Sequence, residues 1–305
     1  MKLLVFGSYE SPRLGVVTSQ GVLDVAAAAA ELGLSGIGTE STDGVVLDPR
    51  TFFSFGLRAL PALREFVARA VDNGSLASCF LDETGLEILP CVPSPGKILC
   101  VGLNYLRHAQ ESNLPTPETP VLFSKFSNTV AAPDEDVPLS RHGVEYDYEA
   151  ELVAVIGKRA KSVTESQALE HVLGYCNGND LSARDLQGLS SQWLLGKTLD
   201  KFMPLGPYLV TADEAGDPQD MSVRSWLNGE LRQDSNTSDM IFSVAHVISY
   251  VSRFMTLEPG DIISTGTPEG VILGMSEKTW MRPGDEIVIE VGDLGRLRNR
   301  MVVGE

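Results

Sequence analysis

One segment constrains the fold of this 305-residue chain more than any other, because it sets acidic side chains at the head of an apolar strand. Residues 146–157 read Tyr-Asp-Tyr-Glu-Ala-Glu-Leu-Val-Ala-Val-Ile-Gly, and the second half is rich in the β-branched residues typical of buried strands. Alternation along a strand puts Glu149 and Glu151 on one face. Carboxylates about 5–7 Å apart repel each other unless a cation lies between them. A cation site is one interpretation, and a solvated edge strand with its acidic residues outward is the other.

A third carboxylate occurs where another short strand, ending in Asn-Gly-Asn, gives way to an expected helix start at Ser182. Asp180 could cap that helix. It could equally complete, with the two glutamates, an all-oxygen set suited to Mg²⁺ or Mn²⁺ that leaves positions open for substrate. The histidine and cysteine spacing typical of zinc sites is missing from the sequence.

Two further segments carry residues that could act on a substrate. His108 and Glu111 are three residues apart, so on a helix they share a face where the carboxylate can orient the imidazole as a general base for water. An exposed helix-surface ion pair is the alternative. The loop Thr-Gly-Thr-Pro-Glu-Gly at 265–270 follows an apolar strand, and its backbone N–H groups could hold a carboxylate, unless it is a plain turn.

Charge and composition exclude several classes of protein. The net charge of −17 opposes binding to nucleic acid and to anionic membranes, so we expect neither partner. An anionic substrate therefore needs a local cation or metal at its site. The first ten residues do not fit a secretory signal, and no apolar run approaches the roughly 18–20 residues of a membrane span, so we expect a cytoplasmic location. The four cysteines have no C-x-x-C spacing and are expected to be buried free thiols.

Turn and strand signals predict the architecture. The rigid stretch 90–96, with three prolines, predicts a boundary between a small N-terminal α+β domain over 1–92 and a catalytic domain over 93–305. Asn228-Gly229 predicts a hairpin, and two Pro-Gly-Asp turns precede the strands after 261 and 285. Helices are predicted from a capping box at 164–167 through 175, over 57–72, and over 243–254. Strands and helices do not alternate regularly, so the fold class is α+β and β-rich rather than a doubly wound sheet.

Taken together, these segments resemble the fumarylacetoacetate hydrolase superfamily, in particular its acylpyruvase-like and dioate-isomerase-like branch. The resemblance spans roughly residues 95–295 and rests on G-x-N-Y-x-x-H-x-x-E, E-x-E, N-D-x-[ST]-x-R-D-x-Q and T-G-T-P-x-G at compatible spacings, together with a lysine. It implies a mixed β-roll wrapped around the active site and assembly as a homodimer.

The resemblance also implies residue roles. Glu149, Glu151 and Asp180 are implied to be the ligands of Mg²⁺ or Mn²⁺. His108 and Glu111 are implied to form a water-activating pair on a mobile lid, which spans residues 111–120. Lys197 is implied to be catalytic as well and, with Gln187, to contact oxygens of a small 2-oxo acid substrate. Further substrate contacts are implied for Lys125, Thr267 and Arg184, although Arg184 can also be interpreted as orienting the carboxylates. Without the resemblance, both lysines would be interpreted as surface residues.

Several reactions share this chemistry. A metal-bound 2-oxo acid stabilises enolate charge, and water activated by His108 would then cleave an acylpyruvate such as fumarylpyruvate to pyruvate and a carboxylic acid. We prefer this hydrolysis at the level of sequence, because both residues that activate water are present. The alternatives are isomerisation of a 2-hydroxy-diene diacid and decarboxylation of oxaloacetate, and a remote one is a non-enzymatic metal- or ligand-binding protein.

Overall fold

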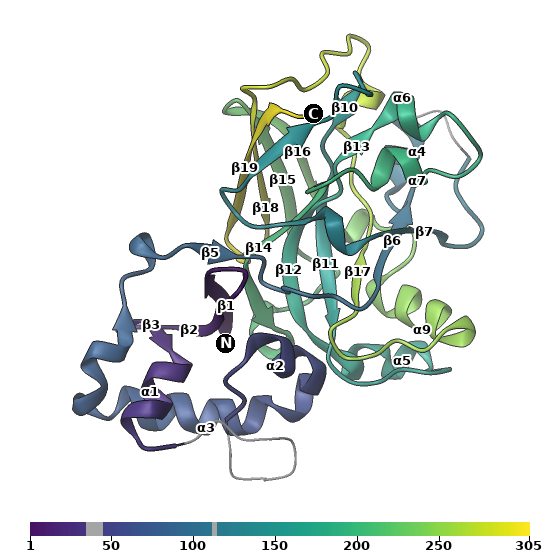
Figure 1. Ribbon diagram of the computed structural model, residues 1–305. Helices are drawn as coiled ribbons and strands as arrows, with labels where there is room; N and C mark the ends of the chain where they lie inside the picture. Colours follow the sequence, from purple (N-terminus) through teal and green to yellow (C-terminus); the bar gives the residue numbers. More distant parts are fainter. Residues whose placement is uncertain (35–44, 112–114) are drawn as a thin grey trace.

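The computed structural model of the protein describes residues 1–34, 45–111 and 115–305 (Figure 1). The strands are β1 (Lys2–Gly7), β2 (Pro12–Thr18), β3 (Gly21–Asp24), β4 (Phe80–Leu81), β5 (Ile88–Leu89), β6 (Ile98–Gly102), β7 (Val121–Lys125), β8 (Val130–Ala131), β9 (Asp136–Leu139), β10 (Tyr146–Asp147), β11 (Ala150–Ile156), β12 (Val172–Asn179), β13 (Ser182–Ala183), β14 (Met203–Thr211), β15 (Ser222–Leu227), β16 (Glu230–Asn236), β17 (Ile262–Ser264), β18 (Glu286–Val291) and β19 (Arg296–Val303). The α-helices are α1 (Val25–Glu31), α2 (Pro49–Phe55), α3 (Leu60–Val71), α4 (Leu106–Glu111), α5 (Glu165–Ala168), α6 (Arg184–Gln187), α7 (Leu194–Lys197), α8 (Ala212–Ala215) and α9 (Val244–Phe254).

Two large sheets organise the molecule (Figure 1). The 12-stranded sheet runs in the order β4-β3-β2-β1-β14-β12-β11-β17-β6-β7, with β5 on β1 and β8 on β14. The 5-stranded sheet runs β16-β15-β18-β19-β9, and β10 pairs with β13. Most neighbours are antiparallel, but β6 and β17 pair in parallel, as do β8 with β14 and β9 with β19. This mixed arrangement confirms the expected α+β, β-rich fold class.

The central strand β11 is buried on both faces. Leu152, Ala154 and Ile156 belong to a core that includes side chains of the 5-stranded sheet, whereas Val153 and Val155 belong to a second core shared with the N-terminal helices. Since β11 also lies between β12 and β17, it has no free edge. Its position explains the continuous apolar run in the sequence and shows that the edge-strand interpretation of 149–156 is wrong.

The N-terminal residues extend the large sheet. β1 pairs antiparallel with β14, so the sheet continues across the predicted boundary between 1–92 and 93–305. In Figure 1, α1 and α3 lie at the opposite end of the molecule from α4, α6 and α7. The domain boundary therefore remains a prediction, and strands from both sides of it belong to one continuous sheet.

Several local predictions are confirmed. Asn228 and Gly229, both with positive φ, join β15 to β16, each Pro-Gly-Asp turn leads into a strand, and α9 begins after a Ser243 side chain that caps it. All four cysteines are buried free thiols. Within 1–34, 45–111 and 115–305, no helix combines the length and apolarity that crossing a membrane requires.

Two local predictions are wrong. The helix that begins at Glu165 ends at Ala168, and Val172–Asn179 form the fully buried strand β12. Its place between β11 and β14 outweighs the helical pattern, because both neighbours supply backbone hydrogen bonds. Ser182 likewise lies in a short strand, and α6 begins at Arg184.

Candidate metal centre and active-site pocket

Antiparallel pairing of β11 with β12 brings the three predicted metal ligands together. Ala150 pairs with Asn179, and the Asp180 amide donates to the Glu149 carbonyl oxygen at 3.0 Å. Carboxylate oxygens of Glu149, Glu151 and Asp180 all lie within 4.8 Å of one another, and all three residues are buried. The cluster has the composition and spacing of a divalent-metal site.

The electrostatics of Glu151 test whether a cation fits. Its carboxylate accepts hydrogen bonds from the Ser264 hydroxyl and the Gly266 amide. Burial and the charges of Asp180 and Glu149 raise the pKa of Glu151 well above its ordinary value. A hard cation among the three carboxylates would remove this repulsion, so the donor set fits Mg²⁺ or Mn²⁺.

Two buried lysines compensate part of the acidic charge. Lys197 donates to Glu149 at 2.8 Å and to Asp180 at 2.9 Å, and Lys125 pairs with Asp180 and donates to the Leu181 carbonyl at 2.9 Å. Interpretation of these lysines as surface residues is therefore wrong. The Asp180 carboxylate is occupied by both of them, so the helix-cap interpretation is wrong as well.

The lysines differ in position. Lys197 lines the pocket, whereas Lys125 contacts Asp180 and is not among the lining residues, which corrects its expected place on the pocket wall. Burial lowers the pKa of Lys125 despite the attraction of Asp180. Burial acts in the same direction on Lys197, but Asp180 and Glu149 outweigh it and raise the pKa of this ammonium.

Arg184 connects the metal-ligand candidates to Gln187. Its guanidinium donates to Glu149 at 2.7 Å, to Asp147 at 2.8 Å and to the Gln187 side-chain oxygen at 3.1 Å. Burial opposes ionisation of Glu149, yet Lys197 and Arg184 outweigh it and hold the pKa of this carboxyl well below its usual range. These contacts fit the interpretation of Arg184 as a residue that orients carboxylates.

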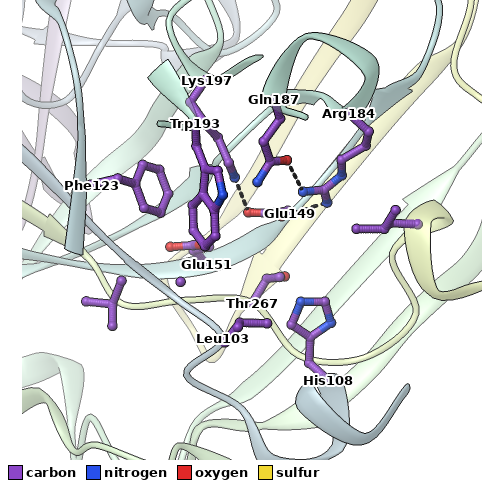
Figure 2. A pocket seen from close by; sticks show the side chains of 13 residues that line it. Leu103, His108, Phe123, Glu149, Glu151, Arg184, Gln187, Trp193, Lys197 and Thr267 are labelled. Carbon is purple, nitrogen blue, oxygen red and sulfur yellow. Dashed lines mark hydrogen bonds and ion pairs between the residues drawn. The ribbon is translucent and has the colours of Figure 1, made fainter. Parts of the chain in front are cut away.

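The pocket beside the cluster has a volume of about 80 Å³. Figure 2 shows Lys197, Gln187 and Arg184 on one side, with His108 and Leu103 on the other. The lining residues are Val101, Gly102, Leu103, His108, Phe123, Glu149, Glu151, Arg184, Gln187, Trp193, Lys197, Thr267 and Leu273.

His108 and Glu111 lie on α4, as predicted, but they are not hydrogen-bonded. His108 Nδ1 is 3.7 Å from the Glu111 carboxylate, which instead accepts from the Gly270 amide at 3.2 Å. His108 is only 6% exposed, so the interpretation of an exposed ion pair is wrong. Its buried Nδ1 has no hydrogen-bond partner in the described parts of the chain.

Thr267 reaches the pocket, but its hydroxyl is already engaged. It donates to the Ala150 carbonyl at 3.0 Å and accepts from Gln233 at 2.9 Å. A hydroxyl has one proton. In this arrangement, contact with a substrate carboxylate would have to come from another group of the loop.

Sequence reasoning missed several residues that hold the site. Asn104 donates to the Thr265 carbonyl and so fixes the loop that carries Thr267, and Gln233 holds Thr267 itself. Asp147 binds Arg184, and its place two residues before Glu149 is the period-2 signal that could have revealed it. The predicted lid over 111–120 includes 112–114, which lie outside the described residues.

Comparison with known proteins connects this site to a family. The chain matches the fumarylacetoacetate (FAA) hydrolase C-terminal family over residues 97–302. It is 39% identical over 255 residues to the mitochondrial oxaloacetate tautomerase of Xenopus laevis, covering 83% of this chain and 78% of that protein. It is 42% identical over 224 residues to a mitochondrial oxaloacetate tautomerase of Homo sapiens, covering 73% and 71% respectively.

Solved structures agree over nearly the whole chain. Fumarylacetoacetate hydrolase from Exiguobacterium antarcticum has 32% identity and a TM-score of 0.74, with 99% of both chains covered. Maleylpyruvate hydrolase from Sphingobium sp. SYK-6, in complex with manganese(II) and pyruvate, has 28% identity and a TM-score of 0.78, with 100% of both covered. The resemblance inferred from the motifs is thus confirmed, and the chain belongs to the fumarylacetoacetate hydrolase family.

Proposed function

We propose that this enzyme binds Mg²⁺ or Mn²⁺ and catalyses enol–keto tautomerisation of a small 2-oxo diacid of the oxaloacetate type. The observation that carries the proposal is the shape of the site, a pocket of about 80 Å³ between His108 and the carboxylate cluster. Relatives at 39% and 42% identity are named oxaloacetate tautomerases. A reaction on an oxaloacetate-type acid, which was the alternative at the level of sequence, thus has stronger support than acylpyruvate hydrolysis.

Pocket size favours a short substrate. The pocket volume is about 80 Å³. A four-carbon diacid fits that space better than fumarylpyruvate, whose chain is longer.

The reaction needs charge compensation and a proton carrier. A divalent cation, when bound, polarises the oxygens of a 2-oxo acid and stabilises enolate charge. Lys197 and Arg184 hold Glu149 in place, and the Gln187 side-chain NH₂, which has no hydrogen-bond partner among the described residues, can donate to a substrate oxygen. His108 takes the enol proton and returns one to C3, so the atoms balance without water. This use of His108 does not require a hydrogen bond to Glu111.

A kinetic assay tests the proposal. Freshly dissolved enol oxaloacetate is followed by its ultraviolet absorbance with Mn²⁺ or Mg²⁺, while lactate dehydrogenase and NADH report any pyruvate in parallel. We expect enol consumption that a chelator stops and that greatly exceeds pyruvate release. Pyruvate formed as fast as the enol disappears would identify a decarboxylase instead.

Acylpyruvate hydrolysis is the second candidate. It is supported by the manganese- and pyruvate-bound maleylpyruvate hydrolase, at 28% identity, and by the 3.7 Å approach of His108 and Glu111. Fumarylpyruvate and acetylpyruvate assayed under the same conditions distinguish it from the tautomerase. The non-enzymatic alternative does not agree with membership of a family of metal-dependent enzymes.

Location and assembly remain predictions. We infer a homodimer from the family resemblance, and size-exclusion chromatography with light scattering tests it. The cytoplasmic location expected from sequence differs from that of the relatives, which are named as mitochondrial. Cell fractionation of the source organism would decide between the two.

A further inference from the structure

Asp147 collects hydrogen bonds from two separate parts of the site, although it does not line the pocket. It lies in β10 and is fully buried. Its Oδ2 accepts from Arg184 Nε at 2.9 Å and from Arg184 Nη2 at 2.8 Å. The Ile272 amide donates to Oδ1 at 2.8 Å and the Leu273 amide to Oδ2 at 3.0 Å. One carboxylate therefore joins an arginine to a loop 125 residues away in sequence.

Through Arg184, Asp147 is connected to a predicted metal ligand and to a predicted substrate contact. The same guanidinium donates to Glu149 at 2.7 Å and to the Gln187 side-chain oxygen at 3.1 Å. A planar guanidinium held at two edges has little freedom to rotate. Asp147 thereby sets the direction in which the Gln187 amide points.

Through the loop 270–274, Asp147 is connected to Glu111 and so to His108, the proposed proton carrier. Leu273 lines the pocket, and the neighbouring Gly274 packs so closely on the Glu111 carboxyl group that a Cβ there would overlap it. The Gly270 amide donates to the same carboxylate. The loop 270–274 thus holds the Glu111 side chain in position, with its carboxylate 3.7 Å from His108.

We propose that Asp147 is a positioning residue that fixes the separation between the Arg184–Gln187 side of the pocket and the wall formed by Leu273, Glu111 and His108. The chemistry of the acceptor carries this assignment. The Tyr148 amide also donates to Oδ1, at 3.0 Å. Asparagine has one acceptor oxygen and an NH₂ group, so it cannot replace a carboxylate that accepts from Arg184 and three amides. The kinetic consequence rests on the proposed function, whereas the structural consequence does not.

Asp147→Asn tests the assignment, with Asp261→Asn as its matched control. Asp261 is also a buried carboxylate paired with a cation and an amide, namely Lys97 and Glu258, but it is not part of the pocket. Hydrogen exchange of the 270–276 segment, pyruvate binding in saturating Mn²⁺, Mn²⁺ affinity, and kcat and KM are measured for both variants.

We expect Asp147→Asn to accelerate exchange of the Ile272 and Leu273 amides by at least about tenfold, because a buried acceptor is lost. Pyruvate binding should weaken about tenfold and kcat/KM should fall about 100-fold, since misplacement of binding groups is costly. Mn²⁺ affinity should change by less than about threefold, because the three ligands remain. Asp261→Asn should leave all of these readouts at wild-type values.

Unchanged loop exchange in Asp147→Asn would overturn the proposal whatever the enzyme's substrate is. Altered exchange with no tautomerase activity in wild type would instead overturn the proposed function. If Asp147→Asn does not fold, Arg184→Lys cuts the arginine side alone. Arg184→Lys should weaken pyruvate binding about tenfold, because a lysine ammonium cannot reproduce the guanidinium contacts with Asp147, Glu149 and Gln187. Hydrogen exchange of the 270–276 segment should stay unchanged. Wild-type pyruvate binding in that variant would refute the link through Arg184.

Discussion

Asp180 illustrates how the chemistry of the site depends on single buried charges. The Lys125 and Lys197 ammonium groups both contact its carboxylate, and its backbone amide pairs with the Glu149 carbonyl. Around the pocket, three cationic side chains face four carboxylates, so negative charge remains for a divalent cation to neutralise. The members are Lys125, Lys197, Arg184, Asp147, Glu149, Glu151 and Asp180.

Asp180→Asn should weaken Mn²⁺ binding by at least about 100-fold and abolish turnover, because a neutral amide replaces one of three anionic ligands. Isothermal titration calorimetry measures the affinity. Asp185→Asn is the control, since Asp185 caps the Val144 amide and lies outside the carboxylate cluster. Equal Mn²⁺ affinity in wild type and Asp180→Asn would remove Asp180 from the metal site.

Lys197→Met should lower kcat and raise KM together, by about 100-fold or more in kcat/KM, because it removes a charge from two carboxylates and from the pocket wall. Salt screens buried pairs weakly. Added KCl should therefore change KM in parallel for variant and wild type. Lys158→Met, at an exposed lysine, is the control. Wild-type kinetics in Lys197→Met would place Lys197 outside the reaction.

At the scale of elements, helix α4 and the loop 270–274 are linked, because two glycines of the loop lie against the Glu111 carboxylate at the end of the helix. Gly270 supplies an amide with φ of 94°, and Gly274 supplies the space beside the carboxylate. A side chain at Gly274 would compete with Glu111 for the same volume, whereas one at Gly270 would overlap the Arg232 carbonyl group. The loop therefore controls how near Glu111 comes to His108.

Gly274→Ala should push the Glu111 carboxylate away from the loop. Hydrolysis of an acylpyruvate, where Glu111 would support water activation, should slow by about 10²–10⁴-fold, the range for loss of general-base catalysis. Tautomerisation, which uses His108 without water, should slow less than about tenfold. Gly85→Ala is the control, since a Cβ there meets nothing within 4 Å. Equal losses in both reactions would show that Glu111 supports His108 in each.

At the scale of the whole molecule, the metal site should stabilise the fold. A ligand that binds only the folded state adds about 2.7 kcal/mol at 100 times its Kd, which corresponds to an increase in Tm of about 5 °C for a chain of this size. Differential scanning calorimetry with Mn²⁺, and then with excess chelator, measures the shift. Asp180→Asn should lose most of this shift, because Mn²⁺ binds that variant more weakly, and a full shift in the variant would indicate another metal site.

The continuity of the large sheet predicts how the predicted domains unfold. β1 pairs with β14, and Val153, Val155 and Leu173 belong to the same core as Phe52 and Phe66. Residues 93–305 expressed alone should therefore expose an apolar face, bind a hydrophobic dye and aggregate. A monodisperse 93–305 fragment that binds Mn²⁺ like the full chain would show that the boundary separates independent domains.

Sequence by itself determined the features that depend on neighbours along the chain. Alternation predicted that Glu151 in β11 and Glu149 immediately before it share a direction, and Asn228-Gly229 specified a hairpin, because backbone period and turn chemistry are local. The motifs identified the family because they preserve residue order as well as residue type.

Only the tertiary structure decided which charges meet. Lys125 contacts Asp180 across 55 residues and Asp147 contacts Ile272 across 125, so neither the burial of the lysine nor the role of the aspartate can be read from its neighbours. The same holds for β12, whose helical pattern gave way to pairing with β11 and β14. The physical reason is that burial and hydrogen bonding between distant segments are worth more than local propensity, and they exist only once the sheet has formed.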